Sequence, residues 1–157
     1  MEEISAHALK GCFDSSEDEI WIPELRHIIW PNRDFLGWIH PSGHLGYVVL
    51  VSPQDGGLTG VVMRRLLRSS ARVRLDMCCL CHHVHRLDGT AMFTVTEKGS
   101  QGRRTIANVV CKNLDCSLRL RNLVAPGSLM AETLYPEAKI WRLQKTLHRW
   151  LARANYL

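Results

Sequence analysis

Two short pairs of cysteines stand out in the sequence, Cys78-x-x-Cys81 and Cys111-x-x-x-x-Cys116. Cysteine thiolates are favoured ligands of Zn²⁺, and the first pair has the spacing of a zinc-knuckle turn. A tetrahedral shell of four sulfurs leaves no coordination position open for a substrate. The four residues therefore predict one structural Zn²⁺ ion and argue against catalysis at the metal.

Neighbouring residues leave the choice of ligands partly open. Cys79 adjoins Cys78, so Cys79-x-Cys81 is an alternative to Cys78-x-x-Cys81. The spacing of two residues in Cys78-x-x-Cys81 is the more typical of a zinc knuckle. Three histidines follow directly and could each replace a thiolate: His82, His83 and His85. Because four cysteines already complete the zinc shell, we expect each histidine to be an exposed polar residue beside the site. The expected ligands are Cys78, Cys81, Cys111 and Cys116, and Cys12 stays unassigned.

Six cysteines in 157 residues could also form disulfides or fill a core. The first residues, Met1 to Ser5, lack the basic and apolar regions of a secretory signal. The longest purely aliphatic run, Val48 to Val51, is far too short to span a membrane. We therefore expect a cytoplasmic protein without membrane contact, a setting in which clustered cysteines hold metal more often than they form disulfides.

The segments around the cysteines predict the elements that would position them. Residues 91–97 and 105–110 are compatible with strands and flank the turn residues 98–102, which is typical of a β-hairpin. A helix-compatible run, Ser117 to Arg121, follows the last cysteine. Two cysteine pairs separated by a hairpin, with the second pair leading into a helix, describe a treble-clef zinc finger.

Before the first cysteine pair, the sequence predicts a three-stranded antiparallel meander. Residues 35–39, 45–51 and 58–63 are apolar, and turns rich in Pro and Gly separate them at residues 41–43 and 53–57. The first 30 residues are expected to be irregular. Their polar stretch at residues 14–19, Pro23 and the Trp30-Pro31 step at their end interrupt any helix there.

A C-terminal helix is predicted from Pro136 to Ala154, with the proline in its first turn. Apolar residues recur at steps of three and four along one side: Ile140, Leu143, Leu147, Trp150 and Ala154. Cations cover the remaining faces: Lys139, Arg142, Lys145, Arg149 and Arg153. We expect the apolar stripe to pack on the core rather than on a partner or a membrane surface.

The predicted fold class is therefore α+β: an antiparallel β-meander joined to a four-cysteine treble-clef zinc finger, with a C-terminal amphipathic helix. Residues 1–30 are expected to form an irregular acidic segment, residues 31–125 the treble-clef domain, and residues 126–157 the helix packed on it. The formal charge of +5 is unevenly distributed, because residues 60–125 hold 12 Arg or Lys against 4 Asp or Glu. Such a basic region suggests an acidic partner or RNA, although a solvated charged face also explains it.

Four stretches of the sequence resemble a known family. They run from Asp34 to Trp38 (DFLGW), from Leu58 to Arg65 (LTGVVMRR), from Met77 to Cys81 (MCCLC) and from Val110 to Ser117 (VCKNLDCS). Their order and spacing resemble the C-terminal treble-clef domain of the elongation-factor-G-binding protein family, which includes the fusidic-acid-resistance proteins. The short actinobacterial members look most similar, and the resemblance covers roughly residues 30–125.

The resemblance implies that the four cysteines bind a structural zinc and that the domain docks on elongation factor G. It also implies a role in translation, in which the protein helps to release a stalled elongation factor G from the ribosome. The resistance proteins carry a separate N-terminal helical domain, whereas about 30 irregular residues precede the shared region in this sequence.

Independently of the family, a rigid zinc knuckle can present neighbouring side chains to an acidic protein surface at low entropic cost. The residues expected on this surface are Leu80, His82, His83, Arg103 and Arg104. The arginine-rich run from Arg64 to Arg74, with Arg119 and Arg121, could extend it. Three cations close to the ligands could instead offset the negative charge of a zinc–tetrathiolate centre: Arg74, Lys112 and Arg119.

Two alternatives to a protein-docking module remain. A basic zinc ribbon could bind RNA or DNA directly, although Phe93 is the only aromatic residue between Arg64 and Leu123 that could stack on a base. A zinc deaminase would need a His-x-Glu pair and a Pro-Cys-x-x-Cys turn, and the sequence contains neither. We therefore expect a binding protein and not an enzyme.

Overall fold

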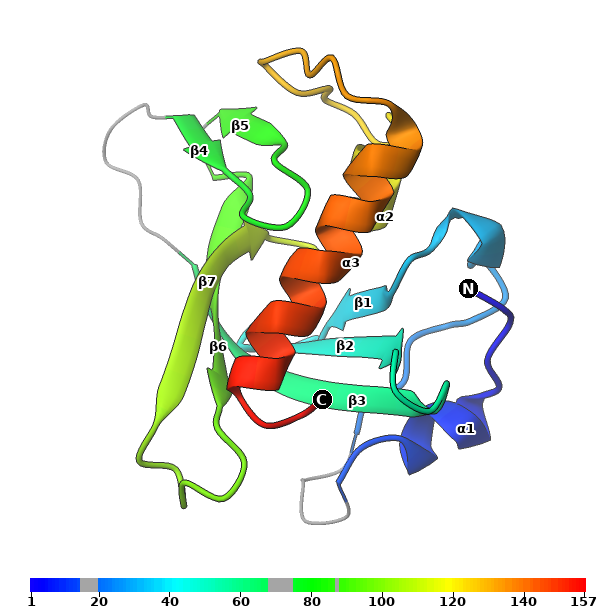
Figure 1. The fold of residues 1–157 in the computed structure, drawn as a ribbon, viewed down its shortest axis with the longest axis vertical. Helices are drawn as coiled ribbons and strands as arrows, with labels where there is room; N and C mark the ends of the chain where they lie inside the picture. The colour runs from blue at the N-terminus through cyan, green and yellow to red at the C-terminus, as the bar shows by residue number, and fades with distance from the viewer. Residues whose placement is uncertain (15–19, 68–74, 87) are drawn as a thin grey trace.

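The computed structural model describes residues 1–14, 20–67, 75–86 and 88–157. Its main feature is a five-stranded antiparallel sheet with the order β1-β2-β3-β6-β7 (Figure 1). The strands are β1 (Leu36–Ile39), β2 (Leu45–Val51), β3 (Leu58–Leu67), β6 (Thr90–Thr96) and β7 (Thr105–Cys111). The predicted meander and the predicted hairpin are both confirmed. They join into one sheet because residues 64–67 of β3 pair with residues 91–94 of β6.

A two-stranded ribbon stands beside this sheet and carries the first cysteine pair. It consists of β4 (Leu75–Met77) and β5 (Val84–Arg86), and the chain turns through Cys78 and Cys81 between them. The second cysteine pair begins at the last residue of β7 and ends at the first residue of α2 (Cys116–Arg119). The arginine-rich run lies partly in β3, and its residues 68–74 are outside the described part of the chain.

The N-terminal segment is more regular than its sequence indicates. A short helix, α1 (Ala6–Gly11), begins after Ser5, whose Oγ accepts a hydrogen bond from the Ala8 N–H at 3.2 Å. A 3-10 turn, η1 (Trp30–Asn32), precedes the sheet. The expectation of an irregular segment was wrong for α1, because a helix of 6 residues is too short to show a clear period. Such a helix is held by burial of Leu9 rather than by intrinsic propensity.

The two faces of the sheet are covered by different parts of the chain. On one face, Leu9, Phe13 and Trp30 from the N-terminal segment pack against Trp38 and Tyr47. The rings of Trp38 and Tyr47 stack with their centroids 5.1 Å apart. Phe13 meets both rings edge-on at 6.0 Å. The acidic segment therefore supplies one of the two hydrophobic layers of the fold.

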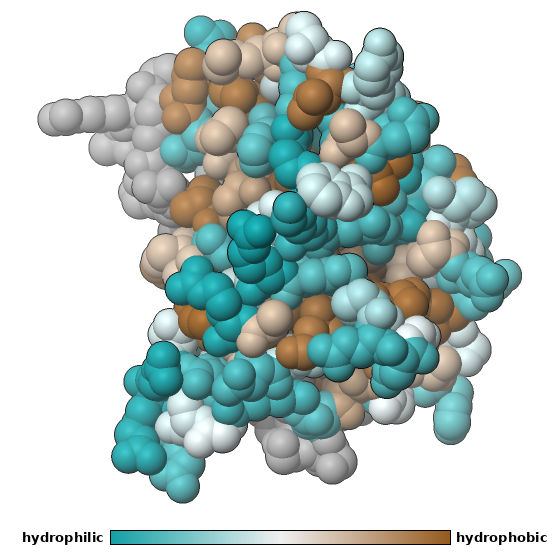
Figure 2. Space-filling view, viewed as in Figure 1, coloured by the Kyte–Doolittle hydropathy of each residue, from teal (hydrophilic) through white to brown (hydrophobic). Residues whose placement is uncertain are grey.

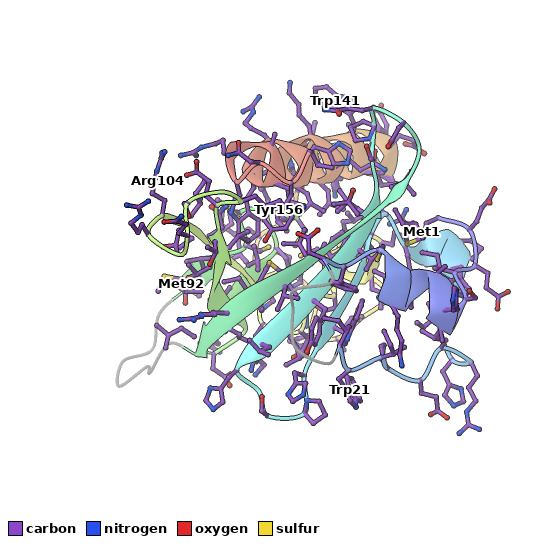
Figure 3. The ribbon with its side chains drawn as sticks, turned by 90° about the horizontal axis from the view of Figure 1, so that it is seen from below. Met1, Trp21, Met92, Arg104, Trp141 and Tyr156 are labelled. Carbon is purple, nitrogen blue, oxygen red and sulfur yellow. The ribbon has the colours of Figure 1, made fainter. Side chains whose placement is uncertain are left out.

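The other face of the sheet is covered by the long helix α3 (Pro136–Arg153) and by the cysteine loops (Figures 1 and 3). The fully buried side of α3 contains Leu143, Leu147, Trp150, Leu151 and Ala154, the last residue lying just after the helix. Ile140 is partly buried against the same cluster. This hydrophobic core is continuous with the four cysteines, so the helix and the metal-binding loops are packed as one unit.

Two glycines let the second cysteine loop approach the sheet closely. A Cβ atom on Gly37 of β1 would lie 2.6 Å from the Cβ and 2.9 Å from the carbonyl oxygen of Leu114. A Cβ atom on Gly46 of β2 would lie 2.6 Å from the ring of Phe93 and 3.1 Å from Cδ1 of Leu114. Leu114 is 1% exposed and lies between two of the cysteines, so these glycines determine how the metal-binding loop meets the sheet.

We expect the substitution Gly37→Ala to lower the free energy of unfolding by about 1–3 kcal/mol, because the backbone of the cysteine loop must move to accommodate the methyl group. Urea denaturation followed by circular dichroism measures the effect. Gly11→Ala is the matched control, since no atom lies within 4 Å of its added Cβ and alanine favours a helix. Equal denaturation midpoints for Gly37→Ala and the wild type would contradict the close approach described above.

Candidate metal centre

The four cysteines predicted as ligands are the ones that the structure brings together. The Sγ atoms of Cys78, Cys81, Cys111 and Cys116 all lie within 4.8 Å of one another. The Cys78–Cys116 distance is 3.6 Å and the Cys81–Cys111 distance is 3.5 Å. A tetrahedral zinc site with Zn–S bonds of about 2.3 Å has sulfur–sulfur distances of about 3.8 Å, so the cluster fits one Zn²⁺ ion. All four are free thiols and at most 4% exposed.

Short backbone turns hold each cysteine pair in place. In the first loop, the His82 N–H donates to the Cys78 carbonyl at 2.9 Å, and the Cys78 N–H donates to the His83 carbonyl at 3.0 Å. In the second loop, the Leu114 N–H donates to the Cys111 carbonyl at 2.9 Å. His82 and Leu114 both have a φ of 57°, in the left-handed region. This conformation lets each loop reverse direction within a few residues and direct two thiols to one point.

Hydrogen bonding among the thiols prepares the site for a cation. Burial raises the pKa of Cys78, but hydrogen bonds from Cys111, Cys116 and Cys81 outweigh burial and hold this pKa well below its usual value. The hydrogen bond with Cys111 raises the pKa of Cys116 well above its usual value. One thiolate is thus stabilised by its neighbours, whereas four adjacent thiolates require a bound metal ion.

A buried cation lies next to the four sulfurs. Arg119 is 9% exposed, and its Nε donates to Asp115 Oδ1 at 2.9 Å. Burial disfavours the charged guanidinium, but Asp115 and the nearby Cys111 and Cys81 more than offset this and raise its pKa. Arg119 is therefore placed to offset negative charge at the metal. Lys112 instead extends to Asp88 at 2.9 Å on the surface, and Arg74 lies outside the described residues.

The expectation that the histidines are exposed was wrong for His83 and His85, which are 6% and 5% exposed because the first cysteine loop folds onto the core. His85 also has a role that the sequence did not reveal. Its Nε2 lies 3.2 Å from Cys111 Sγ, so the ring is hydrogen-bonded to a ligand and is outside the four-sulfur cluster. Burial, with the nearby charges of His83 and Arg119, lowers the pKa of His85 to about 4. The ring is neutral at pH 7 and has one N–H to donate to sulfur. Gly89 makes room for it, because a Cβ there would lie 2.2 Å from His85 Nδ1.

The other two cysteines are not part of the cluster. Burial, together with negative charge at Cys78 and Cys81, raises the pKa of Cys79 to about 12. Burial raises the pKa of Cys12 to about 11, and its thiol donates to the Leu9 carbonyl at 3.0 Å. Both thiols are therefore protonated at neutral pH. Cys78, and not Cys79, belongs to the predicted metal site.

The expected partner surface is corrected by the structure. Leu80 is 1% exposed and lies in the main core, because the first cysteine loop folds back onto that core. His83 is 6% exposed and packs against the ring of His85 at 4.4 Å. His82 is half-buried and, with His83, lines a cleft of about 310 Å³ that also contacts Met130 and Lys139. Leu80 and His83 are therefore not available as rigidly presented contact residues.

Arg103 and Arg104 are exposed, but they are distant from the cysteine cluster. They lie in the turn between β6 and β7, whereas Cys111 ends β7. Seven residues of β7 at about 3.3 Å each separate the two ends by roughly 20 Å. The predicted contact residues therefore do not form one compact face around the zinc knuckle.

An ion pair between Asp34 and Arg121 was also missed at the sequence level. The Arg121 guanidinium donates to both carboxylate oxygens of Asp34, at 2.6 and 2.9 Å. The Asp34 N–H donates to the Ser117 Oγ at 3.0 Å. These contacts join the start of β1 to the segment after the last cysteine, and they assign Arg121 a structural role rather than a place on a docking surface.

Comparisons with known proteins agree with this geometry. A family model described as the FBP C-terminal treble-clef zinc-finger matches residues 6–154. The chain belongs to this family. The matched range includes both α1 and α3, whereas the treble-clef domain was expected over residues 31–125. No curated protein matches the sequence.

A solved structure of the fusidic acid resistance protein FusC has a similar fold, with a TM-score of 0.59 and 16% sequence identity. The similarity covers 97% of this FBP-family chain and 59% of the FusC chain. This chain therefore corresponds to little more than half of that protein. In the described part of the chain, no helix has the length and apolar character needed to cross a membrane.

We expect one Zn²⁺ per chain, and we expect Cys111→Ser or Cys116→Ser to lose both the metal and the fold, because structural zinc contributes directly to folding free energy. Cys79→Ser is the control and should keep both, since this thiol is outside the cluster. Elemental analysis and thermal denaturation provide the two measurements. Full zinc content in Cys116→Ser, or metal loss in Cys79→Ser, would overturn the ligand assignment.

His85→Phe should lower zinc affinity by about tenfold or more while the four ligands remain, because it removes the hydrogen bond to Cys111. Competition with a colorimetric chelator measures the affinity. His7→Phe serves as a control, since His7 is exposed on α1. Equal affinities for the wild type and His85→Phe would show that the hydrogen bond does not stabilise the metal-bound thiolate.

Proposed function

We propose that this protein is a zinc-stabilised binding module, not an enzyme, that docks on elongation factor G and promotes its release from the ribosome. The observation that carries the proposal is the match of nearly the whole chain to the FBP treble-clef family, together with a fold shared with a fusidic acid resistance protein. The sequence resemblance links this family to elongation factor G. Resistance to fusidic acid would follow if release counteracts stalling of the factor.

The metal centre supports binding rather than chemistry. Four buried cysteines complete a zinc shell, so a bound metal has no free position for a substrate or an attacking water. The metal would instead hold the cysteine loops, β7 and α2 in one rigid arrangement. A rigid surface loses little conformational entropy when a partner binds, which favours affinity.

The turn between β6 and β7 is the proposed site of electrostatic steering. Arg103 and Arg104 are exposed there, and Arg104 pairs with Glu97 at 3.0 Å. The turn is held against the end of α3 because the Lys98 N–H donates to the Ala154 carbonyl at 3.0 Å. Exposed arginines on a fixed turn accelerate encounter with an acidic protein surface.

The proposal is tested by measuring binding of the zinc-loaded protein to purified elongation factor G. A second assay follows the dissociation of this factor from ribosomes in the presence of fusidic acid. Saturable binding and faster dissociation are expected. Absence of binding would refute docking, whereas binding without faster dissociation would refute the release activity alone.

Replacing Arg103 and Arg104 with Glu should slow association with elongation factor G by about tenfold at low salt and weaken its salt dependence. Zinc content and melting temperature should not change, because both side chains are exposed. The control carries Lys10→Glu and Arg26→Glu, which change the net charge equally at exposed positions in the N-terminal segment. Unchanged association kinetics in the Arg103/Arg104 variant would exclude this turn from the docking face.

A further inference from the structure

Helix α3 has a strongly cationic side, on which three cations are exposed and two, Lys139 and Arg142, are half-buried. Its cations recur at steps of three or four residues: Lys139, Arg142, Lys145, Arg149 and Arg153. At about 100° per residue they fall within an arc of roughly 120°, and they extend over about 21 Å of helix. Glu137 is the only acidic residue of α3 and lies outside this arc. We call these five residues the α3 cationic face.

Most of this charge is not neutralised by neighbouring groups. Arg142 pairs with Glu132, whose Oε2 lies 2.9 Å from Arg142 Nη2. Lys139 donates to the Glu132 carbonyl oxygen at 3.3 Å. Arg149 and Arg153 have no carboxylate partner among the described residues. The packing of α3 therefore does not explain why its outer side carries so many cations.

An exposed aromatic residue adjoins the α3 cationic face. The Trp141 side chain is 61% exposed and extends away from the sheet (Figure 3). Lys145, one turn later, places its Nζ 4.3 Å from the centre of the Trp141 ring. Figure 2 shows hydrophilic side chains gathered along α3 and continuing towards the turn between β6 and β7. The surface thus combines a row of cations with an accessible aromatic ring.

We propose that the α3 cationic face binds single-stranded nucleic acid, with its cations contacting successive phosphates and Trp141 stacking on a base. A positively charged track with an adjacent aromatic ring is the combination that such binding uses. This inference is separate from docking on elongation factor G and does not require it. It assigns a function to the side of α3 opposite the buried apolar residues.

Two other partners fit this surface less well. An anionic membrane would require an extended apolar side of α3 exposed next to the cations, but the apolar stripe through Leu143, Leu147 and Trp150 is buried. Trp141 is the one large apolar side chain exposed on this helix, all of whose residues the structure describes. Protein–protein interfaces are enriched in arginine, but their centre is depleted of lysine and of charge overall, whereas nucleic-acid interfaces are strongly positive throughout. A row of cations in which, among the described residues, only Arg142 is ion-paired therefore favours a polyanion over an acidic protein surface.

The test uses the full zinc-loaded chain and a fluorescent uridine RNA of about 12 nucleotides, within the size range of known single-strand sites. Contacts to four phosphates, from the four cations that have no ion-pair partner in the described part of the chain, predict a slope of about −3 for log K against log salt concentration. A DNA oligonucleotide of the same length distinguishes recognition of the phosphate backbone from recognition of RNA alone. The absence of saturable binding to either oligonucleotide would overturn the proposal.

Charge reversal by Lys145→Glu with Arg149→Glu should weaken binding by at least about tenfold and reduce the slope by about 1.4. Trp141→Ala should weaken binding by about tenfold with little change in slope, because stacking does not release counterions. The Lys10→Glu/Arg26→Glu protein is the matched control, since it changes charge equally in the segment that covers the opposite face of the sheet. Zinc content and melting temperature confirm that each variant is folded.

Wild-type affinity in the Lys145/Arg149 variant would overturn the proposal, as would an equal loss in the control. Equal displacement of the RNA by a polyglutamate peptide of the same charge would also overturn it, because the face would then recognise acidic protein segments. Retained binding of the Lys145/Arg149 variant to elongation factor G would show that the two surfaces act separately.

Discussion

The negative charge of four buried sulfurs is the constraint on which the rest of this structure depends. Thiolates within 4.8 Å of one another repel strongly in a core and need a cation between them. The chain places Arg119 near Cys111 and Cys81, and the His85 ring 3.2 Å from Cys111 Sγ. The same sulfurs belong to the hydrophobic cluster that α3 covers, so metal binding and core packing stabilise the same arrangement.

Local patterns in the sequence were sufficient to predict the strands of the meander, the hairpin and the ligand set. Cysteine spacing reflects the geometry of a turn, and strand boundaries follow from prolines and glycines a few residues away. Contacts between distant residues left no comparable signal. Asp34 and Arg121 meet across 87 positions, and neither residue type indicates its partner. The burial of Leu80 depends on how a whole loop folds back, which its two cysteine neighbours do not reveal.

The residues near the metal and the residues that could contact a partner lie in different parts of the protein. Residues close to the metal are almost all buried, so the centre of the zinc finger has little surface to offer a partner. The exposed features are instead the turn that carries Arg103 and Arg104 and the outer side of α3. The core holds both of them in place, but their side chains are not part of it. These side chains can therefore differ between proteins that bind different partners while the fold stays the same.

Strand β2 shows how the fold achieves a unique pairing of its strands. In most sheets, alternation of polar and apolar residues prevents a one-residue slip. Residues 46–50 are all buried, so polarity cannot distinguish the two sides of this strand. The sizes of the side chains distinguish the two sides instead. Gly46 faces Phe93 on one side, where a larger side chain would collide with the ring. Tyr47 fills the aromatic cluster on the other side. A slipped strand would exchange the smallest and one of the largest residues, so alignment here is enforced by volume.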